Sequence, residues 1–286
     1  MKKVLFPFEI DHTCYREAYV YAVKMARNLG AELIMLHAFH IEVDNTITPE
    51  KYDKIIKNNW LSAYREIIRF HDYYLQDHAR VDTELRVKTD HRIIHGNLVD
   101  EFRKILHSEG IDLVVLPAAG DTESTVKKLR LLRREALDMD HTSLLSIPCG
   151  RTFLPIENML LVTWMKRLRG LTDYLNELFL FASIFNSSVH CVHFLKHVKE
   201  CLEVEEVMKQ SIQKTRSGGN GTIFHCMGGK DPEKKLEEYI FENEIELLAM
   251  AKGQMHGFQE LHVTALSEEI CAKVGIPVLI LRDSQV

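Results

Sequence analysis

The feature that most constrains the fold of this chain is an internal repeat. The apolar run at residues 4–8 recurs at residues 160–164, and the segment 31–37 recurs as 187–193 with the same offset and no gap. Short apolar runs of this kind are typical of strands buried on both faces of a parallel sheet. The repeat predicts two copies of one supersecondary pattern, so the architecture can be read from a single copy.

The later part of each copy repeats as well. An amphipathic stretch followed by an apolar run lies between Gly96 and Gly120 in the first copy and between Gly229 and Gly253 in the second. The two glycines have the same spacing in both copies, so this match also needs no gap. The second copy is shorter than the first between its second strand and Gly229.

Each copy alternates short apolar runs with helical periodicity. Residues 15–29 and 50–78 carry the apolar spacing of helices that pack on a sheet. Strands that alternate with helices form a parallel sheet covered on both faces, which predicts an α/β fold of two tandem doubly wound domains. Breaker residues cluster at 148–155, so we place the domains at residues 1–150 and 151–286.

Charge and composition exclude several classes of function. The net charge is −5, from 36 basic and 41 acidic residues, which argues against sequence-independent binding to nucleic acid. No apolar run approaches the length that spans a bilayer, and the apolar start of the chain is too short for a signal peptide. The six cysteines show no CxxC spacing, and reduced thiols fit a cytoplasmic protein. We therefore expect a cytoplasmic protein with no nucleic-acid partner and no membrane partner.

Three short stretches match the landmarks of a known family. Residues 6–9 (Phe-Pro-Phe-Glu) form a first strand that ends in proline followed closely by an acid, and residues 29–33 read Leu-Gly-Ala-Glu-Leu before a strand that closes with Leu-His at 36–37. Residues 229–233 (Gly-Lys-Asp-Pro-Glu) supply the third landmark. On these residues the chain resembles the universal stress protein family, and more narrowly its members with two domains in tandem.

The resemblance covers essentially the whole chain and has structural implications. It implies a Rossmann-like or flavodoxin-like sheet with strand order 3-2-1-4-5 in each domain. It also implies pairing of domains through their last strands, which a tandem protein can satisfy within one chain as a pseudo-twofold pair. The sequence leaves open whether the chain also forms a homodimer.

For ATP-binding members, the resemblance implies a loop after the fourth strand that reads Gly-x2-Gly-x9-Gly-Ser/Thr. Its glycines let backbone amides approach phosphate oxygens, and the hydroxyl group completes the anion site. Here the four positions fall on Pro117, Gly120, Arg130 and Leu131. Pro117 has no N–H and Leu131 cannot bond a phosphate, so ATP or AMP is disfavoured as a cofactor.

Residues of the first domain could still line a crevice for a small ligand beyond the carboxyl ends of the strands, where such sheets bind ligands. Glu9 takes the position of the family's aspartate and keeps a carboxylate on a longer arm. The candidate ligand-binding residues of this first crevice are Pro7, Glu9, Ala38, Leu116, Gly120 and Arg130.

The second domain departs further from the ATP-binding pattern. Trp164 and Met165 replace the residues that follow the first strand, Gly253 matches the second glycine, and the final pair falls at Thr264 and a neighbour. We take these four residues as candidates for a second crevice and expect it to be a poor nucleotide site. The apolar side chains of Trp164 and Met165 leave open another small metabolite as its ligand.

A basic cluster beside Gly120 keeps nucleotide binding open as an alternative, because side-chain cations could replace the lost backbone donors. The favoured interpretation is the solvated face of an amphipathic helix. The cluster consists of Lys127, Lys128, Arg130, Arg133 and Arg134.

The remaining motifs indicate neither catalysis nor metal binding. The sequence contains no nucleophile elbow, metalloprotease helix or Walker loop. His37 and His193 occupy equivalent strand ends, where each is expected to bond a nearby backbone group. Adjacent strand residues point to opposite faces, so a zinc site is disfavoured. Its ligands would come from His190, Cys191, His193, His225 and Cys226.

The sequence therefore predicts a universal stress protein that acts as a non-enzymatic stress-response or regulatory protein. It would act through an unidentified protein partner or a small metabolite, with no catalytic residue, no metal and no certain cofactor. The alternative is an adenine-nucleotide-binding member with weak ATPase activity in its first domain.

Overall fold

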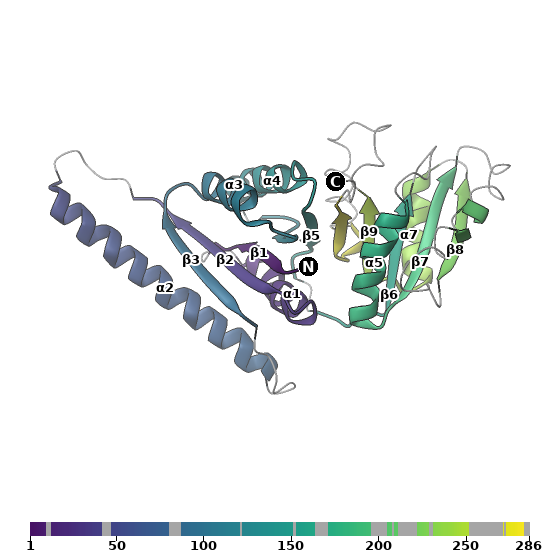
Figure 1. The fold of residues 1–286 in the computed structure, drawn as a ribbon, viewed down its shortest axis with the longest axis horizontal. Coiled ribbons are helices and arrows are strands. Elements are labelled where there is room, and N and C mark those ends of the chain that lie inside the picture. Colours follow the sequence, from purple (N-terminus) through teal and green to yellow (C-terminus); the bar gives the residue numbers. More distant parts are fainter. Residues whose placement is uncertain are drawn as a thin grey trace.

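The computed structural model of the chain is an α/β fold built on one ten-stranded sheet (Figure 1). The candidates for the second crevice, Trp164, Met165, Gly253 and Thr264, lie outside the residues that the structure describes. The described residues are 1–9, 13–41, 47–79, 87–120, 122–150, 153–163, 171–195, 205–207, 209–210, 222–228, 231–251, 271 and 273–282.

The first half of the chain, residues 1–150, contributes five parallel strands in the order β3-β2-β1-β4-β5, which confirms the predicted order. Figure 1 shows α3 and α4 on one face of these strands and α1 on the other. The strands are β1 (Lys3–Pro7), β2 (Glu32–Phe39), β3 (Thr89–His95), β4 (Leu113–Pro117) and β5 (Ser143–Ile147). The helices are α1 (Cys14–Asn28), α2 (Pro49–Ala79), α3 (Leu98–Glu109) and α4 (Glu123–Leu137).

The second half repeats this order as β8-β7-β6-β9-β10, again with parallel neighbours. The repeated apolar runs therefore lie in equivalent strands. The first strands are shifted by one residue from the ungapped sequence match, because Val4 pairs with Leu33 and Leu113 whereas Met159 pairs with Val189 and Leu247. The strands are β6 (Asn158–Thr163), β7 (Ser188–Leu195), β8 (Ile223–Gly228), β9 (Leu247–Ala251) and β10 (Val278–Leu281), and the helices are α5 (Leu171–Phe185) and α7 (Pro232–Glu242).

Backbone hydrogen bonds repeat along with the strands. After α1, Gly30 has a φ of 60°, and Ala31 N donates to the carbonyl of Ala26. After α5, Asn186 has a φ of 55°, and Ser187 N donates to the carbonyl of Ala182. Both residues adopt the left-handed conformation that often ends a helix, which glycine and asparagine tolerate best. These matching helix ends align α1 with α5 residue by residue.

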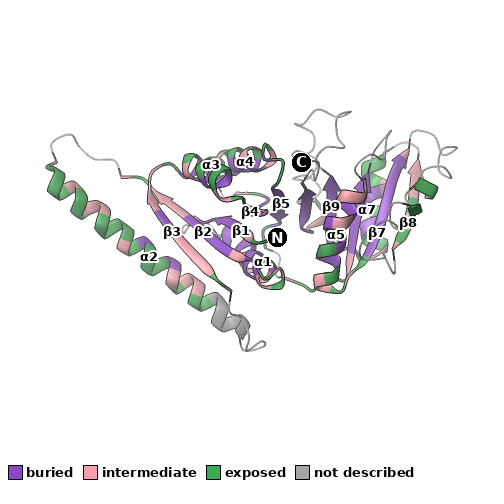
Figure 2. Ribbon diagram, in the orientation of Figure 1, coloured by how far each residue is buried: buried purple, intermediate pink, exposed green. Residues whose placement is uncertain are grey.

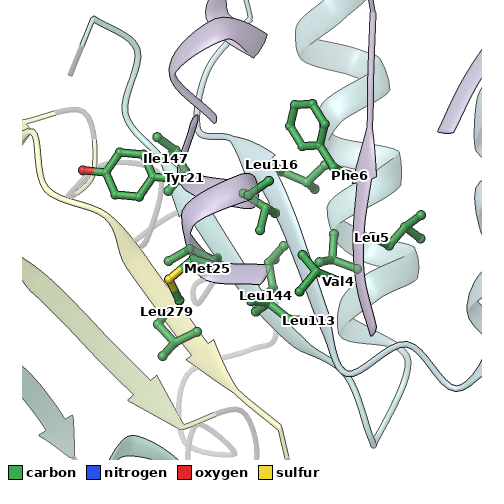
Figure 3. Packing of buried hydrophobic residues seen from close by; sticks show 14 of the residues in the cluster. Val4, Leu5, Phe6, Tyr21, Met25, Leu113, Leu116, Leu144, Ile147 and Leu279 are labelled. Atoms are coloured by element: carbon green, nitrogen blue, oxygen red, sulfur yellow. The ribbon is translucent and has the colours of Figure 1, made fainter. Parts of the chain in front are cut away.

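The two halves join in the middle of the sheet, where β10 pairs with β5 in the antiparallel direction. Leu279 faces Leu145 across this pairing, and both side chains are buried. Figure 3 shows Tyr21 and Met25 of α1 beside Ile147 of β5 and Leu279 of β10. One hydrophobic cluster includes residues of both halves, so the core continues across the junction.

The segment between β2 and β3 contains the 31-residue helix α2, which runs along the edge strand β3 (Figure 1). Trp60 Nε1 donates to the carbonyl oxygen of Ile93 over 3.1 Å, so α2 satisfies one backbone acceptor of β3. The central strands are buried, whereas much of α2 is exposed (Figure 2). Among the described helices, none has both the length and the apolar composition needed to cross a bilayer.

Candidate functional site

The position predicted for the first crevice is at the carboxyl ends of β1 and β4, which are neighbours in the sheet. The chain crosses from β1 to β2 on one side, and β4 flanks β1 on the other, so the strand order reverses here. Pro7 and Leu116 are buried at these strand ends, and Ala38 is half-buried near the end of β2. The structure therefore brings these three predicted residues to one edge of the sheet.

The carboxylate of Glu9 follows β1 and forms an ion pair with the ammonium group of Lys128 in α4. The Glu9 side chain is 13% exposed and that of Lys128 is 33% exposed, so the pair is largely shielded from water. Burial, reinforced by the nearby Glu9 carboxylate, raises the pKa of the Tyr15 phenol well above its ordinary value. The acidic group that the sequence assigns to a ligand is thus engaged by the chain's own lysine.

Arg133 lies under the loop that follows β4 and is 1% exposed. Its Nη2 atom donates to the carbonyl oxygens of Pro117 and Ala118, each over 2.9 Å. A buried guanidinium needs such acceptors, because a charge without partners is costly in the protein interior. The backbone at the end of β4 therefore turns its carbonyl groups toward an internal cation.

The loop after β4 is short and closes tightly onto α4. Thr122 caps the helix, because its hydroxyl oxygen accepts from the amide of Thr125 over 3.2 Å. A Cβ atom on Gly120 would lie 2.8 Å from the side chain of Thr125 and 2.9 Å from the amide nitrogen of Val126. This glycine thus permits the close approach of the loop to the first turn of the helix.

Arg130 and Leu131 lie within α4 and are exposed, so the expected loop does not extend as far as residue 131. Lys128 faces the crevice, and a residue two positions later on a helix points to a different side. Arg130 is therefore not brought to the crevice with Glu9. The interpretation of the basic cluster as a solvated face is wrong for Arg133, which is buried, and incomplete for Lys128, which pairs with Glu9.

The two equivalent histidines make different bonds. His37 Nδ1 donates to the carbonyl oxygen of Phe8 over 2.9 Å, as expected, and so holds the chain that leads to Glu9. His193 Nδ1 is hydrogen-bonded over 2.7 Å to the Thr163 hydroxyl group, a side-chain partner that the sequence did not predict. The bond of His37 holds the segment that follows β1, and the bond of His193 holds the last residue of β6.

The zinc hypothesis gains no support from the described residues, among which no group of three potential ligands converges. His190 Nδ1 is hydrogen-bonded to the Tyr239 hydroxyl over 2.8 Å, and burial lowers the pKa of this histidine. Cys191 on the opposite face is fully buried, and burial raises the pKa of its thiol. These groups therefore pack in the protein interior.

No protein-family model and no curated protein matches the sequence. Solved structures do match over nearly the whole chain. A universal stress protein from Archaeoglobus fulgidus aligns with a TM-score of 0.63 at 13% identity, covering 99% of this chain and 97% of its own. The cytoplasmic domain of a prokaryotic cation chloride cotransporter aligns with a TM-score of 0.58 at 11% identity, covering 100% and 97%.

A functionally unknown protein from Pseudomonas aeruginosa aligns with a TM-score of 0.58 at 13% identity, covering 99% of this chain and 93% of its own. Identities this low show the fold alone. The chain therefore has the Rossmann-like α/β fold found in universal stress proteins.

Proposed function

We propose that the chain is a tandem universal stress protein, with domains at residues 1–150 and 151–286, that regulates without enzymatic activity. The fold shared with a universal stress protein over nearly the full length of both chains supports this proposal. The cytoplasmic domain of a cotransporter shares the same fold, so the fold alone does not identify the activity of this chain. The activity must be inferred from the residues of the site.

The observation that carries the proposal is the internal closure of the first crevice. A nucleotide would use the carboxylate after β1, backbone amides after β4 and the free start of α4. Here Lys128 engages Glu9, Arg133 binds the carbonyls of residues 117 and 118, and Thr122 caps the helix. A triphosphate would have to displace these contacts and lie near the Glu9 carboxylate, which favours a protein without a bound nucleotide.

Action through protein contacts is supported by the exposed face of α2. Trp60, Tyr64 and Tyr73 are 37%, 39% and 62% exposed, and the rings of Trp60 and Tyr64 stack with centroids 5.3 Å apart. Exposed aromatic side chains are enriched where proteins bind one another. The other proposed mode of action is the binding of a small metabolite in the second crevice. The candidate residues of that crevice lie outside the described part of the chain.

The alternative function is adenine-nucleotide binding with weak ATPase activity in the first domain. It is favoured by Lys128, a cation at the crevice that is still one-third exposed. In that case a phosphate group would take Lys128 from Glu9, and the two binding modes would compete for the same ammonium group.

Equilibrium dialysis of the whole chain against labelled ATP and Mg²⁺ decides between the two functions. Our proposal predicts no saturable binding at millimolar ATP for the wild type. Saturable, magnesium-dependent binding that Lys128→Met abolishes would overturn it. Lys127→Met is the matched control, because Lys127 pairs with Glu123 on the exposed side of the same helix.

A further inference from the structure

The antiparallel pairing of β5 with β10 creates two related junctions between the halves. Because each half presents the same strand order to this pairing, a contact made by one half to the other has an equivalent in the opposite sense. We call the region where the chain leaves β10 and meets the start of β5 the first junction. The region where the chain leaves β5 and meets the start of β10 is the second junction.

Arg282 fills the first junction. Its Nη1 atom donates to Asp112 Oδ1 and to the carbonyl oxygen of His141, each over 3.0 Å, and its Nε atom lies 3.6 Å from Glu177 Oε2. The amide of Arg282 donates to Ser143 Oγ, and that hydroxyl donates in turn to Glu177 Oε1 over 2.6 Å. A guanidinium group from the second half is thus held by the Asp112 carboxylate and one carbonyl oxygen, with the Glu177 carboxyl group nearby.

Asp112 of the first junction corresponds to Glu246 of the second. Asp112 Oδ2 accepts from the amides of Lys2 and Lys3, at the start of β1, over 2.7 and 3.2 Å. Glu246 Oε2 accepts from the amides of residues 157 and 158, at the start of β6, over 3.1 and 2.7 Å. In each carboxylate one oxygen accepts hydrogen bonds from backbone amides of its own half, and the other oxygen of Asp112 accepts from Arg282.

The remaining equivalences follow from the matched helix ends and strand registers. Glu177 of α5 corresponds to Tyr21 of α1, since the residues that close the two helices align. Val114 pairs with Leu144 as Leu248 pairs with Val278, so the position before β10 corresponds to the start of β5. By the same alignment the counterpart of Arg282 is Pro148, which has no side chain that could reach a carboxylate.

The second junction contains a cavity where the first contains Arg282. The cavity has a volume of about 170 Å³, and its lining includes Tyr21, Glu246, Gly275 and Pro277. These four residues are the counterparts of the residues that hold Arg282, namely Glu177, Asp112, His141 and Ser143. The cavity of the second junction is therefore lined by the counterparts of the residues that surround a guanidinium group in the first.

We propose that this cavity is a binding site for a guanidinium or alkylammonium group, supplied by a free amine or by a basic side chain of another protein. Glu246 provides the carboxylate, and Tyr21 provides an aromatic ring of the kind that attracts cations. Glu244 lies exposed in the lining, and Leu154 adds apolar surface for an alkyl stem. Within the described residues neither glutamate forms an ion pair with a lysine or arginine.

The cavity lies beside the amino ends of β9 and β10, whereas the first crevice lies at the carboxyl ends of β1 and β4. The inference therefore does not rest on the proposed function. Binding of a cation here and binding of ATP at the crevice are separate results that neither support nor exclude each other.

Isothermal titration of the whole chain with arginine amide tests the site. We expect saturable binding that weakens roughly tenfold when the probe is citrulline amide, its uncharged isostere. Glu246→Gln keeps an oxygen that can accept from the two amides but removes the negative charge, so it should weaken the binding of arginine amide by a similar factor. Glu233→Gln, an exposed change in α7, is the control that should leave binding unchanged. The absence of binding, or equal binding of both probes, would overturn the proposal.

A second variant supplies the cation from the chain itself. Pro148→Arg should place a guanidinium in the cavity as Arg282 does in the first junction, and so prevent arginine amide from binding. Unchanged binding by a folded Pro148→Arg protein contradicts the assigned location. The tripeptide Gly-Arg-Gly distinguishes a basic side chain of another protein from a free amine as the source of the cation. If the tripeptide binds more tightly than arginine amide does, the ligand is a protein side chain. If the tripeptide binds more weakly, the ligand is a free amine.

Discussion

Arg133 is expected to stabilise the first half of the protein strongly, although it belongs to a run of basic residues that looks exposed in the sequence. Arg133→Met keeps a side chain of similar length and removes the donors to the carbonyl oxygens of Pro117 and Ala118. A hydrogen bond from a charged group contributes about 1.5–3 kcal/mol, and loss of the buried charge offsets part of the two bonds. We expect the free energy of unfolding to fall by about 3 kcal/mol.

The assay is equilibrium unfolding in urea, followed by circular dichroism and extrapolated to water. Arg130→Met is the matched control, because Arg130 lies three residues earlier on the same helix and is exposed. An exposed substitution of this kind changes stability by less than about 0.5 kcal/mol. If Arg133→Met behaves like Arg130→Met, the buried arginine does not hold the loop and the reasoning is refuted.

Three further outcomes are expected. Gly120→Ala should lower the free energy of unfolding by about 1–3 kcal/mol in urea titration, because its Cβ would meet the amide of Val126, whereas Gly96→Ala meets atoms no closer than 3.7 Å and should be nearly neutral. Burial raises the pKa of the Glu177 carboxyl group, so the folded wild type loses stability as the pH rises and this group ionises. Glu177→Gln has no such group, so its free energy of unfolding relative to that of the wild type should increase from acid toward neutral pH. A decrease in this difference over the same pH range contradicts the prediction. Trp60→Phe removes one bond to β3 and should cost about 1 kcal/mol in the same unfolding assay.

The fold was largely predictable from the sequence because each buried strand is a short apolar run and the pattern occurs twice. The apolar runs that begin at residues 4 and 160 lie in the first strands of the two halves, β1 (Lys3–Pro7) and β6 (Asn158–Thr163), and the long apolar periodicity at 50–78 lies in α2. The strand order required the family resemblance, because periodicity identifies strands but does not arrange them in a sheet. The candidate residues of the second crevice, which lie outside the described part of the chain, remain predictions.

The closure of the first crevice was harder to predict. Arg133 lies four residues after Leu129 and three before Ala136, so helical spacing does place it on the buried stripe. That signal was masked by the neighbouring arginine and lysine residues. No local pattern could pair Glu9 with Lys128, since the two lie 119 positions apart and meet only when β1 and α4 come together.

The asymmetry of the two junctions has a similar origin. Arg282 and Pro148 follow equivalent strands, but their equivalence depends on the registers of β5 with β4 and of β10 with β9. A sequence comparison that stops at the repeated apolar runs does not reach these flanking positions. The difference between the two junctions is therefore visible only in the tertiary contacts between the halves, and the sequence repeat does not predict it.

A crystal structure of the whole chain grown with ATP and Mg²⁺ tests most directly whether the first crevice is closed by its own side chains. Our account predicts that Lys128 stays paired with Glu9, that Arg133 stays bound to the two carbonyl oxygens, and that no phosphate density lies beside residues 117–125. A triphosphate held by the backbone amides of this loop, with Lys128 turned from Glu9 to its oxygens, would contradict it.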